Sequence, residues 1–263
     1  MKKRRLKHKS FLLAPGLLGS FVGMPFMGDR SGGYSSKVLA TAPANLIGYW
    51  PLWETSGATA DNLEGTAARD GAYTGVTLGN STGPDGRPVP LFDGTNDFVN
   101  IYSASLNTAF NGAAGTFALW HKVSGAGVWT DGVARYMVNL QASANDLIQI
   151  WKTVNNNEVK IDYKAGGTLE TRALVAHSPT AWGHYAITWN KAGDQVIAYY
   201  NGTQAGDTMT ALGIWAGNLL AARTAVGAFR TDAVSNAVDG WMAHAAIWNT
   251  PLTATQMLAL ATV

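Results

Sequence analysis

Carboxylates are sparse in this chain, and one pair shares a strand at a spacing that could serve catalysis. In the stretch EVKIDYK, Glu158 and Asp162 fall on the same side of an alternating segment. Glycoside hydrolysis usually needs two carboxyl groups roughly 5 to 10 Å apart across a cleft. Here Lys160 stands between the two acids on that same side. We interpret the pair as part of a solvated, charge-paired strand, and we expect no enzymatic activity.

The histidines give no stronger catalytic signal. His121 and His184 stand beside Trp in predicted strands, and His177 precedes a Ser-Pro turn. The chain has no H-x-x-x-H pair, no phosphate-binding loop and no dinucleotide fingerprint. It also lacks cysteine, which excludes disulfides, thiolate metal sites and a thiol nucleophile.

Tryptophan is the residue type that points to a ligand. The chain has ten, and an exposed indole face can stack on a sugar ring. Trp129 lies in the loop-like stretch GAGVWTDGVAR beside Asp131, and loops between strands are common places for ligand sites. We expect Trp129 to be the best exposed candidate, with Asp131 beside it as a ligand-binding residue, and Trp151 and Trp215 to be further candidates. A tryptophan in a loop can also cover the end of a sandwich or pack on a neighbouring subunit.

Short apolar strands separated by turn residues must position these side chains. The abundance of Gly (30 residues) and the low charged content (14%) favour an all-β fold with many turns. The pair Asn201-Gly202 between apolar flanks predicts a tight hairpin, because both residues accept a positive φ. Thr250 or Thr253 is expected to cap a short C-terminal helix. Strands are predicted within residues 46–53, 90–102, 115–123, 134–142, 146–154, 158–166, 184–190, 195–209 and 239–249.

Several segments, in order from about residue 46 to the end, resemble the laminin-G-like, concanavalin-A-like jelly rolls. The stretches that carry the resemblance are YWPLWETSGATAD, PLFDGTNDFVNI, GTFALWHKV, WGHYAITWN, AYYNGTQAG and VGAFRTDAVSNAVDGWMAHAAIWNTPLTATQM. The resemblance implies two antiparallel sheets packed face to face, and it places Trp50, Trp120, Trp182, Trp189 and Trp248 in or near the core. It does not decide function, because this fold carries glycan-binding, adhesive, enzymatic and viral structural proteins.

The same resemblance implies a possible Ca²⁺ site at the rim of the sandwich. Asp61, Asp93, Asn96 and Asp97 are the candidate ligands, since Ca²⁺ prefers oxygen donors from carboxylates and loop carbonyls. The chain departs from the family pattern after Gly240, where Ala243 and His244 replace the acidic residues that family members often carry. Asp and Asn are also common turn formers, so structural turns remain the alternative.

The first 45 residues differ from the rest of the chain. The first nine carry six basic residues, whereas the remaining chain has 13 basic and 17 acidic residues and no basic region typical of nucleic-acid binding. The apolar stretch that follows is interrupted by Gly and Pro, which argues against its being the apolar helix of a signal peptide. It is also shorter than the ~20 apolar residues that a membrane span needs. We expect an arm that anchors the chain to neighbouring subunits through Lys2, Lys3, Arg4, Arg5, Lys7, Lys9, Phe11, Leu12, Leu13, Phe21 and Phe26.

Together these patterns predict an N-terminal arm over residues 1–45 and a two-sheet jelly roll with a short C-terminal helix over residues 46–263. We expect a non-catalytic structural or adhesion protein without sequence-specific nucleic acid as a partner. It would be displayed on a virion surface, as the junction YSSKVLATAPANLIGYWPLWETSG resembles that of phage-encoded laminin-G-like proteins, and it would bind host glycans. The alternatives are a secreted carbohydrate-binding module with a cleaved signal peptide and, less favoured, a glycanase.

Overall fold

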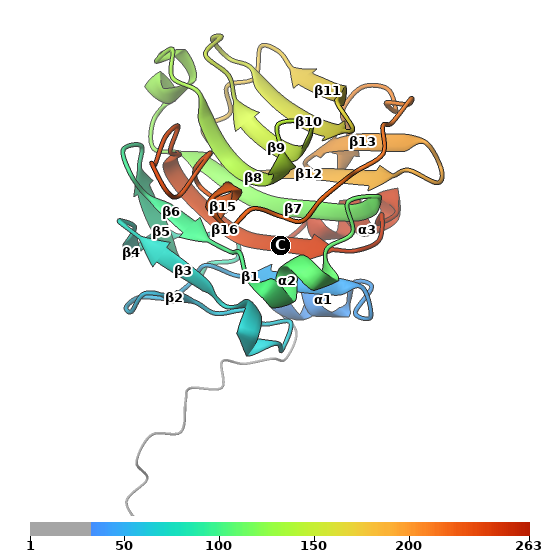
Figure 1. Cartoon of the computed structure of the whole chain (residues 1–263). Helices are drawn as coiled ribbons and strands as arrows, with labels where there is room; N and C mark the ends of the chain where they lie inside the picture. The colour runs from blue at the N-terminus through green and yellow to red at the C-terminus, as the bar shows by residue number, and fades with distance from the viewer. Residues whose placement is uncertain (1–32) are drawn as a thin grey trace, which may run out of the picture. The chain divides into compact units, whose positions relative to one another are not determined.

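Two antiparallel eight-stranded sheets face each other in the computed structural model, which describes residues 33–263 (Figure 1). Sheet A follows the order β14-β13-β12-β7-β16-β5-β4, with β1 also pairing with β16. Its strands are β1 (Leu46–Trp50), β4 (Thr77–Thr82), β5 (Pro88–Asp93), β7 (Ala114–Val123), β12 (Gly183–Asn190), β13 (Gln195–Tyr200), β14 (Thr203–Gln204) and β16 (Asp239–Trp248).

Sheet B follows the order β11-β10-β9-β8-β15-β6-β3-β2. Its strands are β2 (Thr59–Ala60), β3 (Gly71–Thr74), β6 (Phe98–Asn100), β8 (Arg135–Ser143), β9 (Asp146–Lys152), β10 (Val159–Ala165), β11 (Thr168–Leu174) and β15 (Thr224–Val226). In the described part of the chain, three short α-helices accompany the sheets: α1 (Tyr34–Ala40), α2 (Ala104–Ala109) and α3 (Ala254–Leu260). The predicted two-sheet sandwich with a C-terminal helix is confirmed. No helix among residues 33–263 is long and apolar enough to cross a membrane.

Local sequence explains several of these elements. Asn201 and Gly202 have φ values of 48° and 75°, as the predicted hairpin between β13 and β14 requires. Thr253 caps α3 through a capping box with Gln256, so the second of the two predicted caps is the one used. Met257 and Leu260 form the buried side of α3, whereas Leu258 is 57% exposed.

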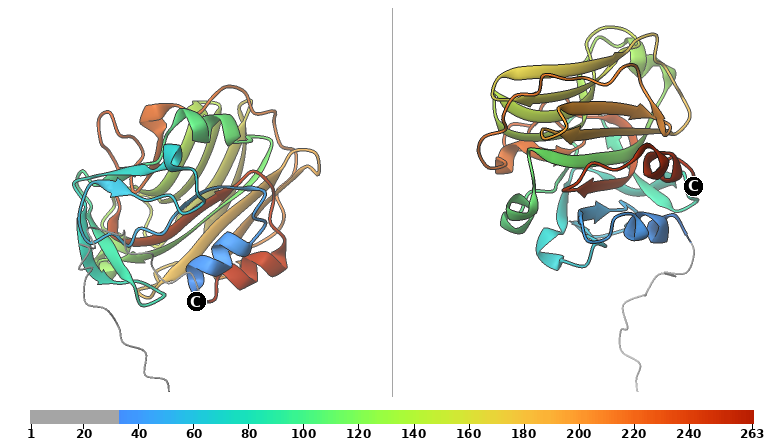
Figure 2. Two further views of the ribbon diagram at one scale, coloured as in Figure 1. Left: turned by 90° about the horizontal axis from the view of Figure 1, so that it is seen from below. Right: turned by 90° about the vertical axis from the view of Figure 1, so that its right-hand side faces the viewer.

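Sheet A is buried on both of its faces. Alternation along β7 sends Phe117 and Leu119 to the core between the sheets and Ala118 and Trp120 to the opposite face. That outer face forms a second apolar cluster, which α1 and α3 cover side by side (Figure 2). Within residues 33–263, sheet B has no such cover over β9 and β10, whose outward residues are polar or aromatic apart from Leu147.

Helix α1 belongs to the folded domain rather than to the N-terminal arm. Tyr34 and Val38 are buried on sheet A, and the Tyr34 hydroxyl donates a hydrogen bond to the Leu260 carbonyl at 2.7 Å and accepts one from Trp120 Nε1 at 2.9 Å. The boundary predicted at residue 46 is therefore too late, since the described domain already includes residue 34. The predicted anchoring side chains, from Lys2 to Phe26, lie outside the described residues.

A bulge in β16 places His244 beneath α1. The register of β16 with β7 shifts between Ala243 and Ala246, and His244 has a φ of 54°. His244 Nε2 lies 3.2 Å from the Asp85 carboxylate, and its Nδ1 lies 2.9 Å from the Tyr49 hydroxyl. Burial lowers the pKa of His244 despite the opposing effect of Asp85, so the neutral ring donates to Asp85 and accepts from Tyr49.

Burial also keeps other histidines neutral. It lowers the pKa of His121 and of His184 to about 3 and that of His177 to about 4. His121 and His184 are 5% and 1% exposed, so both rings are packed inside the domain. Folding therefore excludes protons that the unfolded chain would bind near its ordinary histidine pKa.

Substituting Val38 tests whether α1 is part of the domain. We expect Val38→Ala to lower the free energy of unfolding by about 2 kcal/mol, because it removes two methyl groups that are 1% exposed. The matched control is Val154→Ala, whose side chain is 58% exposed, and it should leave stability nearly unchanged in urea unfolding. Equal effects of the two substitutions would show that α1 does not pack on sheet A.

The buried histidines predict a loss of stability on acidification. An unfolded chain binds protons on its histidines below about pH 6.5. In that range the free energy of unfolding should fall by about 1.4 kcal/mol per pH unit for each histidine that the folded state keeps neutral. Because their folded pKa values are depressed, His121 and His184 contribute stability that is present above that pH and is lost as the pH falls. Urea unfolding between pH 7.5 and 5.0 measures the slope of the unfolding free energy against pH. The His184→Phe variant should have a slope that is smaller by about 1.4 kcal/mol per pH unit, which corresponds to one proton. An unchanged slope in that variant would contradict the assignment.

Candidate functional site

The outer face of sheet B carries a row of aromatic rings that crosses the strands. Tyr136 of β8 and Trp151 of β9 are register partners whose rings stack at 5.1 Å with an interplanar angle of 6°. Phe229, from the segment after β15, lies on the other side of Tyr136 at 4.8 Å. All three side chains are partly exposed. We call Phe229, Tyr136 and Trp151 the aromatic ladder.

A cation lies at each end of the aromatic ladder. Lys160 of β10, the register partner of Trp151, places Nζ 5.9 Å from the indole centroid. At the other end, the Arg223 guanidinium lies 5.3 Å from the centre of the Phe229 ring. Both distances are within the range of a cation–π contact. A cation therefore lies against each of the two end rings of the ladder.

A polar row runs beside the aromatic ladder. Thr171, Asp162, Gln149 and Asn139 are successive register partners on β11, β10, β9 and β8. Gln149 Nε2 donates to Asn139 Oδ1 at 2.9 Å, and Asn139 Nδ2 donates to the Phe229 carbonyl at 2.7 Å. These contacts tie the backbone that carries Phe229 to the sheet and leave Asn139 fully buried.

Asp162 holds Trp151 in place. Its carboxylate accepts hydrogen bonds from Trp151 Nε1 at 2.7 Å and from the Thr171 hydroxyl. Burial raises the pKa of Asp162, and the hydrogen bonds from Thr171 and Trp151 oppose that rise. The hydrogen bond to Asp162 therefore fixes the orientation of the indole.

The structure places the predicted aromatic candidates in three different settings. Trp151 lies in the aromatic ladder. Trp215 lies on Gly112, where an added Cβ would come within 2.1 Å of the indole, and it covers one end of the core. The expectation that Trp129 is exposed is wrong: it is 1% exposed, and its Nε1 donates to the Pro179 carbonyl at 2.9 Å.

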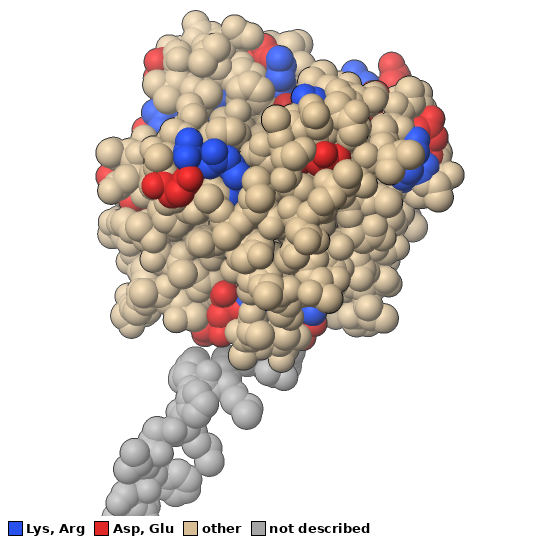
Figure 3. Space-filling view, viewed as in Figure 1, with Lys and Arg blue, Asp and Glu red and all other residues tan. Residues whose placement is uncertain are grey.

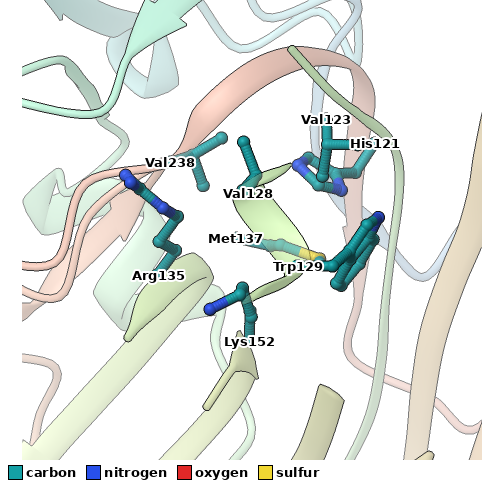
Figure 4. A pocket seen from close by; sticks show the side chains of 8 residues that line it. All are labelled: His121, Val123, Val128, Trp129, Arg135, Met137, Lys152 and Val238. Atoms are coloured by element: carbon teal, nitrogen blue, oxygen red, sulfur yellow. The ribbon is translucent and has the colours of Figure 1, made fainter. Parts of the chain in front are cut away.

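Trp129 instead lines a small pocket inside the sandwich, close to Met137 (Figure 4). Buried Lys152 also borders this pocket and donates to Asp131 Oδ1 at 2.8 Å. Asp131 makes a second ion pair with Arg135 at 2.7 Å, so this predicted ligand-binding residue compensates two cations. Burial disfavours the carboxylate, but the hydrogen bonds from Lys152 and others outweigh it and lower the pKa of Asp131.

The predicted Ca²⁺ ligands belong to two separate segments of the fold. Asp93 ends β5, and Asn96 and Asp97 lie in the turn that leads to β6. In this turn Asp97 Oδ2 accepts from the Asp93 N–H at 2.8 Å, and Asp93 Oδ1 accepts from the Thr95 N–H at 2.8 Å. Asp61 follows β2, and its N–H donates to Glu54. No group of three or more His, Asp or Glu side chains suited to a metal occurs within residues 33–263. Calcium binding stays a prediction, and the hydrogen bonds observed are those of turns.

Possible catalytic groups are engaged in other contacts. Glu158 pairs with Lys160 at 3.6 Å and accepts from Asn155 at 3.0 Å, whereas Asp162 is bound by Trp151 and Thr171. The stretch GNSTG at residues 79–83 matches the pattern G-x-S-x-G, but it lies in and just after β4, an edge strand of an antiparallel sheet. A nucleophile elbow needs a sharp turn from a strand into a helix, which β4 does not supply.

Charge is distributed in small groups over the surface. The view in Figure 3 shows separate groups of basic and acidic side chains on a largely uncharged face. This view contains no extended basic surface of the kind that nucleic-acid-binding domains present.

Comparisons with known proteins agree with this architecture. A family model described as the concanavalin A-like lectin/glucanases superfamily, of the laminin-G type, matches residues 93–257. No curated protein matches the chain.

Solved structures resemble the chain in fold at low sequence identity. Domain 4 of an extracellular GH43 arabinanase from Geobacillus stearothermophilus, solved with arabinotriose, is 15% identical with a TM-score of 0.57, over 83% of this chain and 98% of that one. The binding domain of Paraclostridial Mosquitocidal Protein 1 is 16% identical with a TM-score of 0.60, over 83% and 52%. The Trypanosoma rangeli sialidase with sialic acid is 12% identical with a TM-score of 0.61, over 83% and 33%.

The chain thus spans about half of the mosquitocidal binding domain and a third of the sialidase. At these identities the three likenesses concern the fold, whereas the family model covers more than half of the sequence. The chain therefore belongs to the concanavalin A-like lectin/glucanase superfamily.

Proposed function

We propose that this protein is a non-catalytic carbohydrate-binding domain whose ligand lies on the outer face of sheet B. The observation that carries the proposal is the aromatic ladder beside a polar row, on a part of the sheet that no helix within residues 33–263 covers. A sugar offers C–H groups on its ring faces and hydroxyls around its edge. Aromatic side chains beside hydrogen-bonding groups can satisfy both.

The ladder is suited to this task because its rings are already held in place. Trp151 is fixed by Asp162, Tyr136 lies between Trp151 and Phe229, and Phe229 is tied to the sheet through Asn139. Rigid aromatic groups supply contact area with little loss of conformational entropy. Exposed Thr171 adds a hydroxyl beside them.

A solved structure of similar fold supports carbohydrate as the substrate class. The arabinanase domain, of which the match covers 98%, is in complex with arabinotriose. The contacts of Glu158 and Asp162 support binding without hydrolysis, because each carboxylate is held by neighbouring side chains rather than facing a second acid across a cleft.

The N-terminal segment supports a second part of the proposal, namely display of the domain on a larger assembly. The basic and apolar residues of this segment precede α1 in the sequence, and α1 itself packs on sheet A. We favour a virion surface as that assembly, with neighbouring subunits as partners of the segment. A secreted module with a cleaved signal peptide is the alternative.

Removing the indole of Trp151 tests the binding face. In native affinity gels containing neutral or acidic polysaccharides, we expect the full chain to be retarded by at least one polysaccharide. Trp151→Ala should weaken that retardation at least about tenfold, a loss of ~1.4 kcal/mol.

The matched control is Trp241→Ala. Trp241 is also partly buried, lies near a cation (Lys122, 5.2 Å) and donates through Nε1 to Asn80, but it is on the outer face of sheet A. Retardation lost in the Trp241 variant and kept in the Trp151 variant would place the site on the wrong sheet. No retardation by any polysaccharide would refute carbohydrate binding.

The mass of the mature protein separates display from secretion. If the N-terminal segment is an anchor, intact mass spectrometry of the protein from its native source should find the residues from Lys2 to Phe26 retained. Deleting residues 2–31 should then abolish association with particles while leaving the melting temperature of the domain unchanged. A mature protein that begins after this segment would contradict the anchoring role and support the cleaved signal peptide.

A further inference from the structure

The charged side chains that border the aromatic ladder are paired with opposite charges. Lys160 at the Trp151 end pairs with Glu158 at 3.6 Å. At the Phe229 end, Asp232 pairs with Arg223 at 3.1 Å and with Arg230 at 2.6 Å. With Asp162 beneath Trp151, three carboxylates balance three cations around the ladder.

These pairs are fixed by further contacts. Glu158 also accepts a hydrogen bond from Asn155, and its side chain is 14% exposed. Asp232 receives two hydrogen bonds from Arg230, through Nε and Nη2, in addition to the one from Arg223. Such a two-pronged contact between Arg and a carboxylate is stronger and more specific than a single ion pair.

One further cation lies on the same face of sheet B. Lys164, two residues beyond Asp162 on β10, donates to the Ala144 carbonyl at 2.9 Å and interacts electrostatically with Asp146. Its charge is therefore also close to a carboxylate.

We propose that Glu158 and Asp232 keep the aromatic ladder electrically neutral and thereby restrict it to uncharged polysaccharide chains. This inference rests on the proposed function and names the substrate class of the same site. A chain of uronic or sialic acids would bring its carboxylates next to Lys160 or Arg223. There it would meet Glu158 or Asp232 already in place, and like charges at this range repel.

A neutral chain faces no such competition. It can contact the ring edges of the ladder and the hydroxyl of Thr171 without displacing an ion pair. Its affinity should depend little on salt, because no net charge is neutralised on binding.

Removing the two carboxylates tests the inference directly. We expect the wild-type full chain to bind at least one neutral polysaccharide, among arabinan, galactan, mannan and mixed-linkage β-glucan, with affinity that is similar in 20 mM and 500 mM NaCl. It should not bind polygalacturonate, alginate or polysialic acid. The double variant Glu158→Gln with Asp232→Asn should gain binding to the acidic chains, about tenfold or more at 20 mM NaCl, and should lose the gain at 500 mM NaCl.

The matched control changes the net charge by the same amount elsewhere. Asp207→Asn with Glu170→Gln removes two carboxylates that make no ion pair within residues 33–263, and Glu170 points to the opposite face of β11 from Thr171. This control should not gain binding to acidic chains. Equal melting temperatures of the variants and the wild type establish that the fold is kept, and Glu158→Gln alone replaces the double variant if Asp232→Asn unfolds the chain.

The possible failures of the two proposals differ. Wild-type binding to acidic chains that is weakened by salt and lost in Trp151→Ala would overturn the inference and leave the proposed function standing. A double variant that gains no acidic binding would overturn the roles of Glu158 and Asp232. A wild-type chain that binds none of the polysaccharides would refute the proposed function, and the inference with it.

Discussion

Burial of sheet A on both faces is the constraint on which the rest of the molecule depends. Trp120 and Trp248 project from its outer face and must be covered, and α1 and α3 supply that cover. The constraint explains why the domain begins at α1 and why a bulge turns His244 toward Tyr34 and Asp85 beneath the helix. Among residues 33–263, this layer closes much of the outer face of sheet A, and the binding surface that we propose therefore lies on the outer face of sheet B.

On sheet B, the core and the proposed binding surface use opposite faces of the same strands. The inward side chains of β8, β9 and β10 fill the core, and their outward side chains form the ladder and the polar row together with Phe229 and Thr171. The polar groups closest to the sheet are hydrogen-bonded to neighbouring side chains. Asn139 accepts from Gln149, and Asp162 accepts from Trp151. This arrangement holds the aromatic rings above them in one orientation.

The sequence predicted the sandwich well, because strand alternation and turn chemistry are local signals. The alternation in ARYMVNLQA, DLIQIWKTV and EVKIDYKAG also placed polar and aromatic residues outward, so Tyr136 could have been found beside Trp151. Phe229 could not, since it comes from an irregular segment whose position depends on a bond to Asn139. Trp129 looked exposed because its stretch is rich in Gly, yet tertiary packing buries it. Helix α1 was missed because seven residues carry too little periodicity to reveal its apolar side.

The most direct test of the binding face is an NMR titration that follows the tryptophan indole N–H signals. The protein is labelled with ¹⁵N and titrated with oligosaccharides of the polysaccharide that retards it in affinity gels. Carbohydrate binding on the outer face of sheet B predicts that the Trp151 signal shifts in a saturable way, while those of buried Trp50 and Trp189 stay in place. A saturable shift of Trp241 or Trp215 without one of Trp151 would contradict the account.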